Sequence, residues 1–399
     1  MKRFILIAVA LVGCKWTDFD DLSDQTWVRS QDKPSIGSTD YAVSITAAST
    51  GTDGGTLAVV STDAPTMSTI QYDAKGTDKV GGNVSKLGQF FIASLGEKPI
   101  LVNDGMGHVA LVEKAVDNGQ IAVVSGDPNA PNSQAFAGPP PNAAAYAGTN
   151  LLIAAAAPQA TDPNFFVDDG TMNMPQCSLL DETGMPLQAA AIATDTTRVW
   201  VWTKTGSVIA YDLNQFVAGS CSGVNKATAA FTQTFSPGTG ARIHIVNGNG
   251  KEWAVLAAHA DKATNGEVVV LDLTAADSVT PPMEIGTPLM VDGLLSSTIA
   301  TFDGQTYVVL GIPTKQVGST QAGQVEIHAF DVGNGTLDAD SMETLNDAQP
   351  EGGQLFGRDV AAMQFNGKTI LVVAASNEVY AYYRTSVYPT DTRNPPPSP

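Results

Sequence analysis

The sequence is poor in charged residues, and poorest in basic ones. Charged side chains make up 15% of the 399 residues, against roughly 25% in an average globular domain. Lysine and arginine together number 21, against 40 aspartates and glutamates, so the formal net charge is −19. Nucleic acids and anionic lipid surfaces are bound through clustered basic side chains. The charge balance therefore argues against both kinds of partner.

Residue types that commonly carry catalysis or metal binding are also few. The histidines are His108, His244, His259 and His328, and there are three cysteines. No Gly-x-Ser-x-Gly or His-Glu-x-x-His motif occurs, and no spacing suggests zinc. His244 and His328 fall inside expected strands, whereas His259, with Asp261, falls on an expected loop, where it either is simply solvated or contacts a partner. We name no catalytic residue and no metal ligand, and we expect a protein that is not an enzyme.

The chain begins with an apolar run that is too short to span a bilayer. Residues 4–12 are apolar, whereas a membrane helix needs roughly 20 such residues. A basic head precedes the run and Gly13-Cys14 follows it, as in a secretory signal peptide. Leu11-Val12-Gly13-Cys14 resembles the lipobox of bacterial lipoproteins. The resemblance implies that residues 1–13 are removed and that Cys14 receives a diacylglyceryl group and a further acyl chain such as palmitate; the alternative is an ordinary signal peptide with a chance cysteine.

Lipidation would make the mature protein a membrane-anchored one. Each buried methylene contributes about 0.8 kcal/mol, and two acyl chains already give stable anchoring. Removal of residues 1–13 leaves 19 basic and 40 acidic residues, a net charge of −21. Lys15 follows the cysteine, which favours the outer membrane of the cell envelope over the inner one. We expect residues 14–34 to form the tether and residues 386–399, which are rich in proline, to form a disordered tail.

The two remaining cysteines, Cys177 and Cys221, suggest one disulfide in an exported chain. Free buried thiols are the alternative. A bridge between these residues would close a loop of 44 residues, worth about 4 kcal/mol by the chain-entropy model.

A repeated unit organises the rest of the chain. Seven short apolar runs recur at a mean spacing of about 52 residues, and their length and β-branched residues predict strands. The runs cover residues 57–60, 100–102, 151–153, 199–202, 253–256, 307–310 and 370–373. Turn dipeptides precede several of them, at Asp53-Gly54, Asn247-Gly248, Asp303-Gly304 and Asn366-Gly367.

Each unit thus predicts a small antiparallel meander, which cannot bury both of its faces alone. Repetition around a ring covers these faces. We therefore expect an all-β fold over residues 35–385, a β-propeller of seven blades. Residues 26–29, around Trp27, either supply the outer strand of the last blade or act as a hydrophobic plug. The unit around residues 118–170 is the least regular.

The last unit resembles an FG-GAP repeat, the blade of the integrin α-chain propeller and of many bacterial surface proteins. The resemblance is carried by Phe356-Gly357, by Val360, by the apolar strand ending at Ala375 and by Glu378-Val-Tyr-Ala-Tyr382. It implies a non-enzymatic module that binds or scaffolds an envelope protein or a glycan. Many FG-GAP loops bind calcium through Asp-x-Asp-x-Asp-Gly, but the corresponding loops here offer no more than one carboxylate each. We expect plain hairpin turns and no cofactor.

Two other functions stay open. Val201-Trp202, followed by Gly206-Ser-Val-Ile-Ala-Tyr-Asp212, also resembles the repeat of quinoprotein-like propellers, a family that includes a lipoprotein serving outer-membrane protein assembly. A propeller enzyme that acts on polysaccharide or with a quinone in its central channel is the third possibility. Trp200 and Trp202 fall on one face of their strand, which favours core filling over a sugar-stacking platform.

Overall fold

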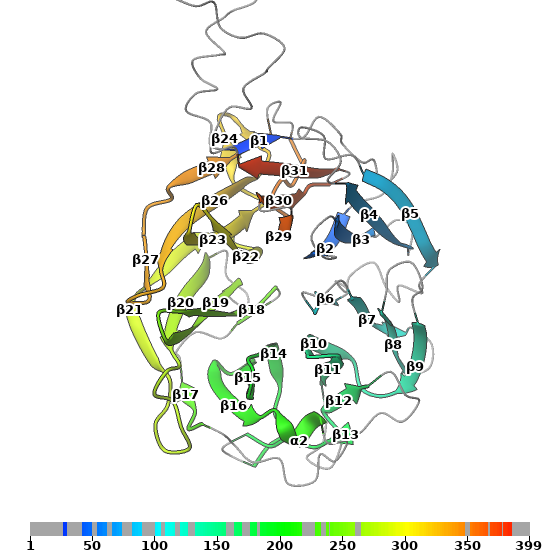
Figure 1. The fold of residues 1–399 in the computed structure, drawn as a ribbon, viewed down its shortest axis with the longest axis vertical. Coiled ribbons are helices and arrows are strands. Elements are labelled where there is room, and N and C mark those ends of the chain that lie inside the picture. The colour runs from blue at the N-terminus through cyan, green and yellow to red at the C-terminus, as the bar shows by residue number, and fades with distance from the viewer. Residues whose placement is uncertain are drawn as a thin grey trace, which may run out of the picture.

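The computed structural model describes residues 27–29, 42–49, 54–61, 66–73, 82–89 and, with short gaps, 100–384. Among these residues the secondary structure is β apart from a single helical turn, α2 (Asn214–Val217). Antiparallel sheets stand around a common axis as in a β-propeller (Figure 1). The all-β propeller expected from the repeat is confirmed.

The described strands form seven sheets of four or five strands. In six of them the chain starts near the ring axis and runs outward, and in the last the outermost strand is the first strand of the chain. The first sheet contains β2 (Ala42–Ser49), β3 (Gly54–Ser61), β4 (Thr66–Asp73) and β5 (Gly82–Gln89). The next two contain β6 (Ile100–Asn103), β7 (Val109–Ala115), β8 (Gln120–Gly126) and β9 (Asn132–Ala137), then β10 (Pro141–Ala147), β11 (Asn150–Ala155), β12 (Phe165–Asp168) and β13 (Gln176–Cys177).

The second half of the ring repeats this pattern. Two sheets contain β14 (Ala189–Thr194), β15 (Arg198–Thr203), β16 (Ser207–Asp212) and β17 (Phe231–Thr232), then β18 (Arg242–Gly248), β19 (Lys251–His259), β20 (Asn265–Asp272) and β21 (Met283–Asp292). The sixth contains β22 (Ser296–Phe302), β23 (Gln305–Ile312), β26 (Gln324–Asp331), β27 (Thr336–Leu337) and β28 (Glu343–Leu345), beside a small ribbon of β24 (Gln316–Val317) and β25 (Thr320–Gln321). The last contains β29 (Asp359–Phe365), β30 (Lys368–Ala374), β31 (Val379–Arg384) and β1 (Trp27–Arg29).

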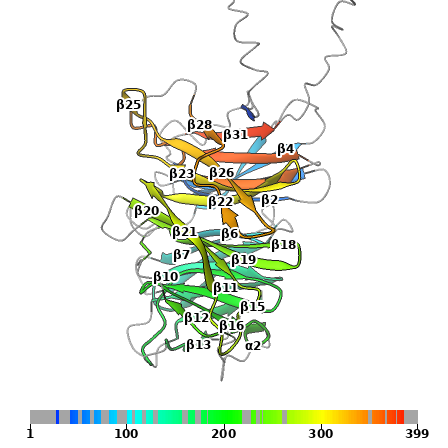
Figure 2. The ribbon, with the colours of Figure 1, turned by 90° about the vertical axis from the view of Figure 1, so that its left-hand side faces the viewer.

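The strand from the start of the chain completes the last sheet. β1 pairs antiparallel with β31, with Trp27 opposite Arg384, and the two strands lie together at one edge of the ring (Figure 2). Trp27 is also buried, and its ring meets that of Phe302 edge to face at 4.9 Å. Trp27 therefore both pairs as a strand residue and fills the core.

Six of the seven apolar runs form the second strand of a sheet, as the repeat predicts, and one does not. Residues 100–102 lie in β6, the innermost strand of its sheet, and the second strand there is β7. The expected position of this run is wrong, because a second apolar run, the fully buried Val109-Ala-Leu-Val112, forms the second strand of the sheet instead. The irregular stretch 118–170 accordingly spans parts of two sheets.

Two tight turns have the backbone that their residues favour. Asp303 and Gly304 both have positive φ, 51° and 74°, as a two-residue hairpin of type I′ requires. In the preceding sheet the turn residues are Asn249 and Gly250, with φ of 54° and 74°, rather than the expected Asn247-Gly248. β18 continues through Gly248, because its backbone still pairs there with Lys251. Asp53 and the pair Asn366-Gly367 lie outside the described residues.

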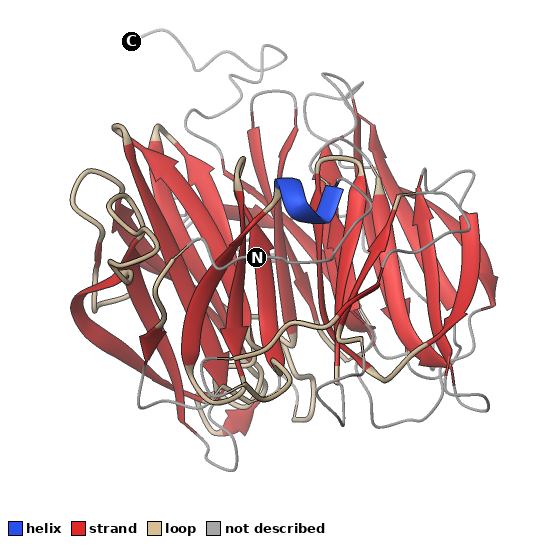
Figure 3. Cartoon of the chain, turned by 90° about the horizontal axis from the view of Figure 1, so that it is seen from below, coloured by secondary structure: helices blue, strands red, loops and turns tan. Residues whose placement is uncertain are grey.

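The core lies between the sheets, where neighbouring faces pack together (Figure 3). Trp200 and Trp202 of β15 are fully buried and share one cluster with Leu256 of β19 and Leu271 of β20. The expectation that this tryptophan pair fills core is thus confirmed. Burying a large apolar side chain contributes roughly 1.5–3 kcal/mol, so each sheet depends on its neighbours for much of its stability.

Candidate functional site

The innermost strands carry very little charge. β2, β6, β10, β14, β18, β22 and β29 line the ring axis (Figure 1). In the whole of these strands the Asp, Glu, Lys, Arg and His side chains are Arg242 and His244, both on β18, and Asp359 on β29. All three residues belong to one polar cluster, the ring-centre cluster, which we define as Arg242, His244, Ser297, Asp359 and the backbone N–H of Ile45.

Arg242 reaches across one complete sheet to the next. From β18, its Nη1 donates to the carbonyl of Ser297 on β22 at 2.8 Å and, more weakly, to that of Val360 on β29 at 3.4 Å. Its Nη2 donates to Asp359 Oδ1 at 2.5 Å. A guanidinium is suited to such a role, because its rigid fork offers five N–H donors. The side chain therefore ties the inner strands of three consecutive sheets together.

Asp359 continues this connection to a fourth sheet. It is completely buried, and its Oδ2 accepts a hydrogen bond from the backbone N–H of Ile45 on β2 at 2.9 Å. Its Oδ1 accepts from the N–H of Val360 at 3.0 Å, as well as from Arg242. A buried carboxylate is tolerated when it is both paired and hydrogen-bonded, and Asp359 meets both conditions.

His244 is held in its neutral form beside the arginine. Its Nε2 shares a hydrogen bond with Ser297 Oγ at 2.8 Å. Burial, and then the neighbouring positive charge of Arg242, lower the pKa of His244 to about 3. The imidazole is therefore uncharged at neutral pH. It serves as a hydrogen-bonding group, and the expectation that His244 is an ordinary strand side chain agrees with this position.

A second polar cluster joins the two sheets that contain β15 and β19. Asp195, in the turn before β15, accepts from Arg198 Nε at 3.0 Å and from Trp200 Nε1 at 2.7 Å. Arg198 also pairs with Glu252 of β19 and lies 4.6 Å from the centre of the Trp200 ring. Burial, followed by the charge of Asp195, raises the pKa of Glu252. This cluster binds one sheet to the next through a single arginine.

The FG-GAP-like residues lie together at the junction of the last two sheets. Phe356 is fully buried, with its ring 5.5 Å from that of Tyr380 and 6.2 Å from that of Tyr382, both on β31. Gly357 has a φ of +83°, and a Cβ there would approach the carbonyl oxygen of Gln324 to 2.6 Å. The phenylalanine, the glycine and the two tyrosines of the sequence pattern therefore form one packing unit.

Acidic side chains surround the tyrosine of this unit. Tyr380 Oη donates to Asp347 Oδ2 at 2.7 Å and also contacts Glu378, while Gln354 donates to Asp347. Burial, and then the hydrogen bonds to Glu378 and Asp347, raise the pKa of Tyr380 above its usual value. The phenol therefore stays protonated and holds the loop before β29 against β31.

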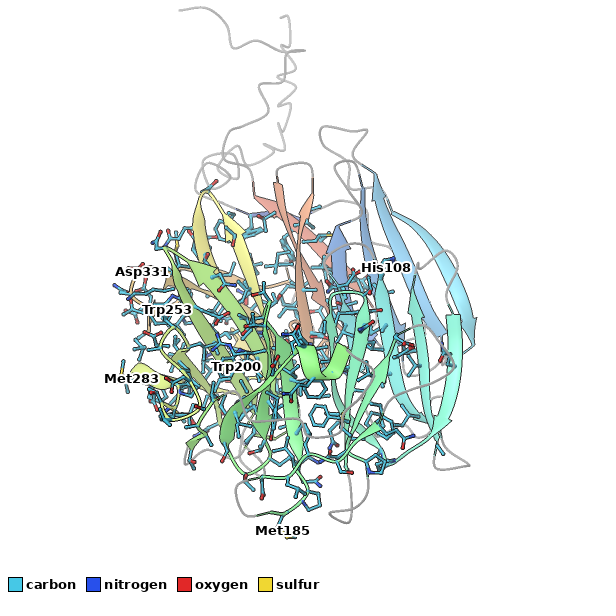
Figure 4. The ribbon with its side chains drawn as sticks, turned by 60° about the horizontal axis from the view of Figure 1, so that its bottom comes forward. His108, Met185, Trp200, Trp253, Met283 and Asp331 are labelled. Carbon is cyan, nitrogen blue, oxygen red and sulfur yellow. The ribbon has the colours of Figure 1, made fainter. Side chains whose placement is uncertain are left out.

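The other histidines lie apart from the ring-centre cluster. His108 is exposed at the β6–β7 turn, where Asp104 Oδ2 lies 2.6 Å from its Nδ1, and it stands on the opposite side of the ring from Trp253 (Figure 4). His259 is the half-buried last residue of β19 rather than a loop residue, and Asp261 lies outside the described residues. His328 is buried within β26, as expected, with Nδ1 3.0 Å from the carbonyl of Asp338. The structure thus does not bring the four histidines together.

The expected covalent features are described only in part. Cys177 ends β13, is buried and is disulfide-bonded. Cys221 lies outside the described residues, so its pairing with Cys177 stays a prediction. Cys14, with its predicted lipidation, also lies outside them.

The fold places this chain among the β-propeller proteins. Among the described residues, no helix has the length and apolarity to cross a membrane, and no three His, Cys, Asp or Glu side chains gather as metal ligands. No model of a known protein family matches the chain, and no curated protein matches it.

Proposed function

We propose that this protein is a seven-bladed, FG-GAP-type propeller, anchored to the cell envelope through a lipid on Cys14, that binds a protein or a glycan without catalysing a reaction. Each of the seven sheets is one blade. The outer membrane is the proposed location, because Lys15 follows the lipidated cysteine.

The packing of Phe356 carries this proposal. The FG-GAP resemblance pairs a Phe-Gly near the start of a blade with aromatic residues in its third strand. Phe356 lies against Tyr380 and Tyr382 in this way. At the ring centre the charged side chains bond to one another and to backbone groups between sheets, so the proposal gives them a structural role. Propeller folds serve many functions, so a partner must be found by experiment.

The proposal can be tested by affinity capture. The lipidated protein, carrying a tag, is mildly crosslinked in its own cell envelope and then captured with whatever is bound to it. We expect at least one envelope protein or glycan to be recovered reproducibly. A Cys14→Ser variant is the matched control, because it keeps the propeller and loses the anchor; a partner recovered by both forms contacts the propeller. Recovery of no reproducible partner would contradict the proposal, and recovery of outer-membrane assembly components would favour the quinoprotein-like alternative.

Mass spectrometry of the mature N-terminus tests the anchor separately. We expect the chain to begin at Cys14 and to carry the mass of its acyl groups. An unmodified Cys14 would overturn the anchor and leave the binding role to be judged on the capture experiment alone.

A further inference from the structure

The junction between the first and the last sheet differs from every other junction in the ring. Neighbouring sheets elsewhere are joined by the chain as it passes from an outer strand to the next inner strand. Between the last sheet and the first, the chain also passes from an outer strand, β1, to an inner strand, β2, but β1 comes from the opposite end of the chain to the other three strands of its sheet. This covalent connection holds the ring together only while β1 stays paired with β31.

The closure by β1 is short. It consists of three paired residues, Trp27 to Arg29, opposite Arg384 to Tyr382, together with the packing of the Trp27 indole on Phe302. A three-residue strand at a sheet edge is expected to open locally more readily than the central strands. We call this pairing the outer closure.

A different set of contacts joins the same two sheets at the ring axis. Asp359 of β29 accepts the backbone N–H of Ile45 on β2, and Asp359 and Ile45 are both buried. Arg242 holds the other carboxylate oxygen of Asp359 from a third sheet. We call the bonds among Asp359, Ile45 and Arg242 the inner clasp.

The clasp bond from Ile45 to Asp359 differs in chemistry from the side-chain bonds at two other inner-strand junctions. Thr194 of β14 donates to the carbonyl of Tyr146 on β10 at 2.5 Å, and Asn103 of β6 donates to Thr46 of β2 at 2.7 Å, which are bonds between neutral groups. Hydrogen bonds to a buried carboxylate are roughly twice as strong as neutral ones. A charge-assisted bond therefore stands at the junction where the covalent connection is weakest, although charged bonds also join the sheets of β15 and β19 and those of β18 and β22.

We propose that the ring has two separable closures, and that the inner clasp keeps the first and last sheets together when the outer closure opens. β1 begins 13 residues after Cys14. Any pull from a membrane anchor would reach β1 before any other strand, so the outer closure could detach under load without opening the ring. Detachment of the outer closure under load rests on the proposed lipid anchor, whereas the existence of the two closures does not.

The two closures can be tested by hydrogen exchange. The lipidated full-length protein is labelled in detergent, and the exchange of its peptides is measured by mass spectrometry. In Trp27→Ala we expect faster exchange in β1 and β31, with β2 and β29 still protected. In Asp359→Asn we expect about tenfold faster exchange in β2 near Ile45, with β1 unchanged, because a charge-assisted hydrogen bond becomes a neutral one. In the double variant we expect both effects. We also expect its decrease in Tm to exceed the sum of the decreases in the two single variants.

Thr194→Val is the matched control for the clasp. It removes a side-chain bond between neighbouring sheets that the chain also connects, so exchange in β10 and β14 should change little. If Asp359→Asn does not fold, Arg242→Gln tests the clasp from its other end. It removes the guanidinium that pairs with Asp359 and leaves a buried carboxylate without its ion pair, so exchange near Ile45 should again be faster.

Two results would overturn the proposal. One is loss of protection in β2 and β29 in Trp27→Ala alone, and the other is unchanged exchange near Ile45 in both clasp variants. Repeating the measurements on Cys14→Ser separates this inference from the proposed function. If Cys14 proves unmodified, the load argument fails but the exchange pattern still decides whether two closures exist.

Discussion

Phe356 and Tyr380 lie with their ring centres 5.5 Å apart and their planes inclined by 57°, which joins the loop before the last sheet to that sheet's third strand. Phe356 is fully buried and also meets Tyr382 edge to face. Aromatic pairs in such geometries contribute roughly 0.5–1.5 kcal/mol beyond the burial of their surface. The phenylalanine of the sequence pattern thus packs the loop before β29 against β31.

Substituting Phe356 by alanine should lower the free energy of unfolding by about 3–5 kcal/mol, because it leaves a cavity among buried aromatic rings. Chemical denaturation measures the change. Val279→Ala, at an exposed position, is the control and should have little effect. A loss below about 1 kcal/mol in Phe356→Ala would show that the ring is not packed as described.

Gly335 should be far less tolerant of alanine than Gly353, although the two have similar backbone angles. Their φ values are +77° and +79°, so each alanine should cost roughly 1–2 kcal/mol for the left-handed conformation alone. A Cβ on Gly335 would also come within 2.5 Å of the Trp253 ring, whereas nothing lies within 4 Å of one on Gly353. We expect Gly335→Ala to lose about 1–3 kcal/mol more than Gly353→Ala in denaturant unfolding. Equal losses would contradict the described contact with Trp253.

The protein should lose stability in mild acid partly through His244. Its pKa in the folded protein is about 3, below the ordinary value of 6.5 that applies in the unfolded chain. Above pH 6.5 the imidazole is neutral in both states, and its contribution to stability is fully present. As the pH falls from 6.5 towards 3, the unfolded chain binds a proton that the folded protein does not, so the free energy of unfolding falls by at most about 1.4 kcal/mol per pH unit.

His244→Gln should make this decline shallower, because glutamine keeps a hydrogen-bonding group near Ser297 and does not titrate. Urea unfolding at about pH 7, 5.5 and 4.5 gives the comparison. Carboxylates contribute equally to both proteins, so the difference between the two curves isolates the imidazole. Parallel curves would mean that His244 is protonated alike in the folded and unfolded states.

Cys177→Ser should lower the Tm if the disulfide of Cys177 is formed with Cys221. The bridge would close a loop of 44 residues, and losing it should cost about 4 kcal/mol on the chain-entropy model. Peptide mapping without reduction identifies the partner directly. Cys221→Ser should give the same loss, and the double variant should lose no more than either single one. A linkage of Cys177 to any other residue would contradict the pairing.

The repeated strands could be predicted because they depend on local patterns. Runs such as residues 253–256 and 307–310 have the length and β-branched residues of buried strands, and Asp303-Gly304 has the residues of a tight turn. The register of the second unit could not be predicted, because β6 and β7 are both apolar and only pairing with neighbouring strands decides which of them is innermost.

The ring-centre cluster could not be predicted from the sequence either, because its residues come from distant parts of the chain. Arg242 and Asp359 are 117 residues apart. Arg242 stands in no motif, and Asp359 lies between Gly357 and Val360 without being one of the residues that carry the FG-GAP resemblance. His244 could be placed in a strand, but its lowered pKa arises from burial beside Arg242 and Ser297. Such groups become neighbours only when the ring brings the inner strands of several sheets to one axis.

The sequence by itself determined that this chain repeats a small β unit, that each unit has one face to bury against the next, and that a strand around Trp27 was available to complete the last. These properties follow from the periodicity and composition of short segments. The tertiary structure alone decided that β1 pairs with β31 while Asp359 binds Ile45 at the axis. Closing a ring brings together residues from the two ends of the chain, and the contacts that they make depend on the geometry of all the sheets between them.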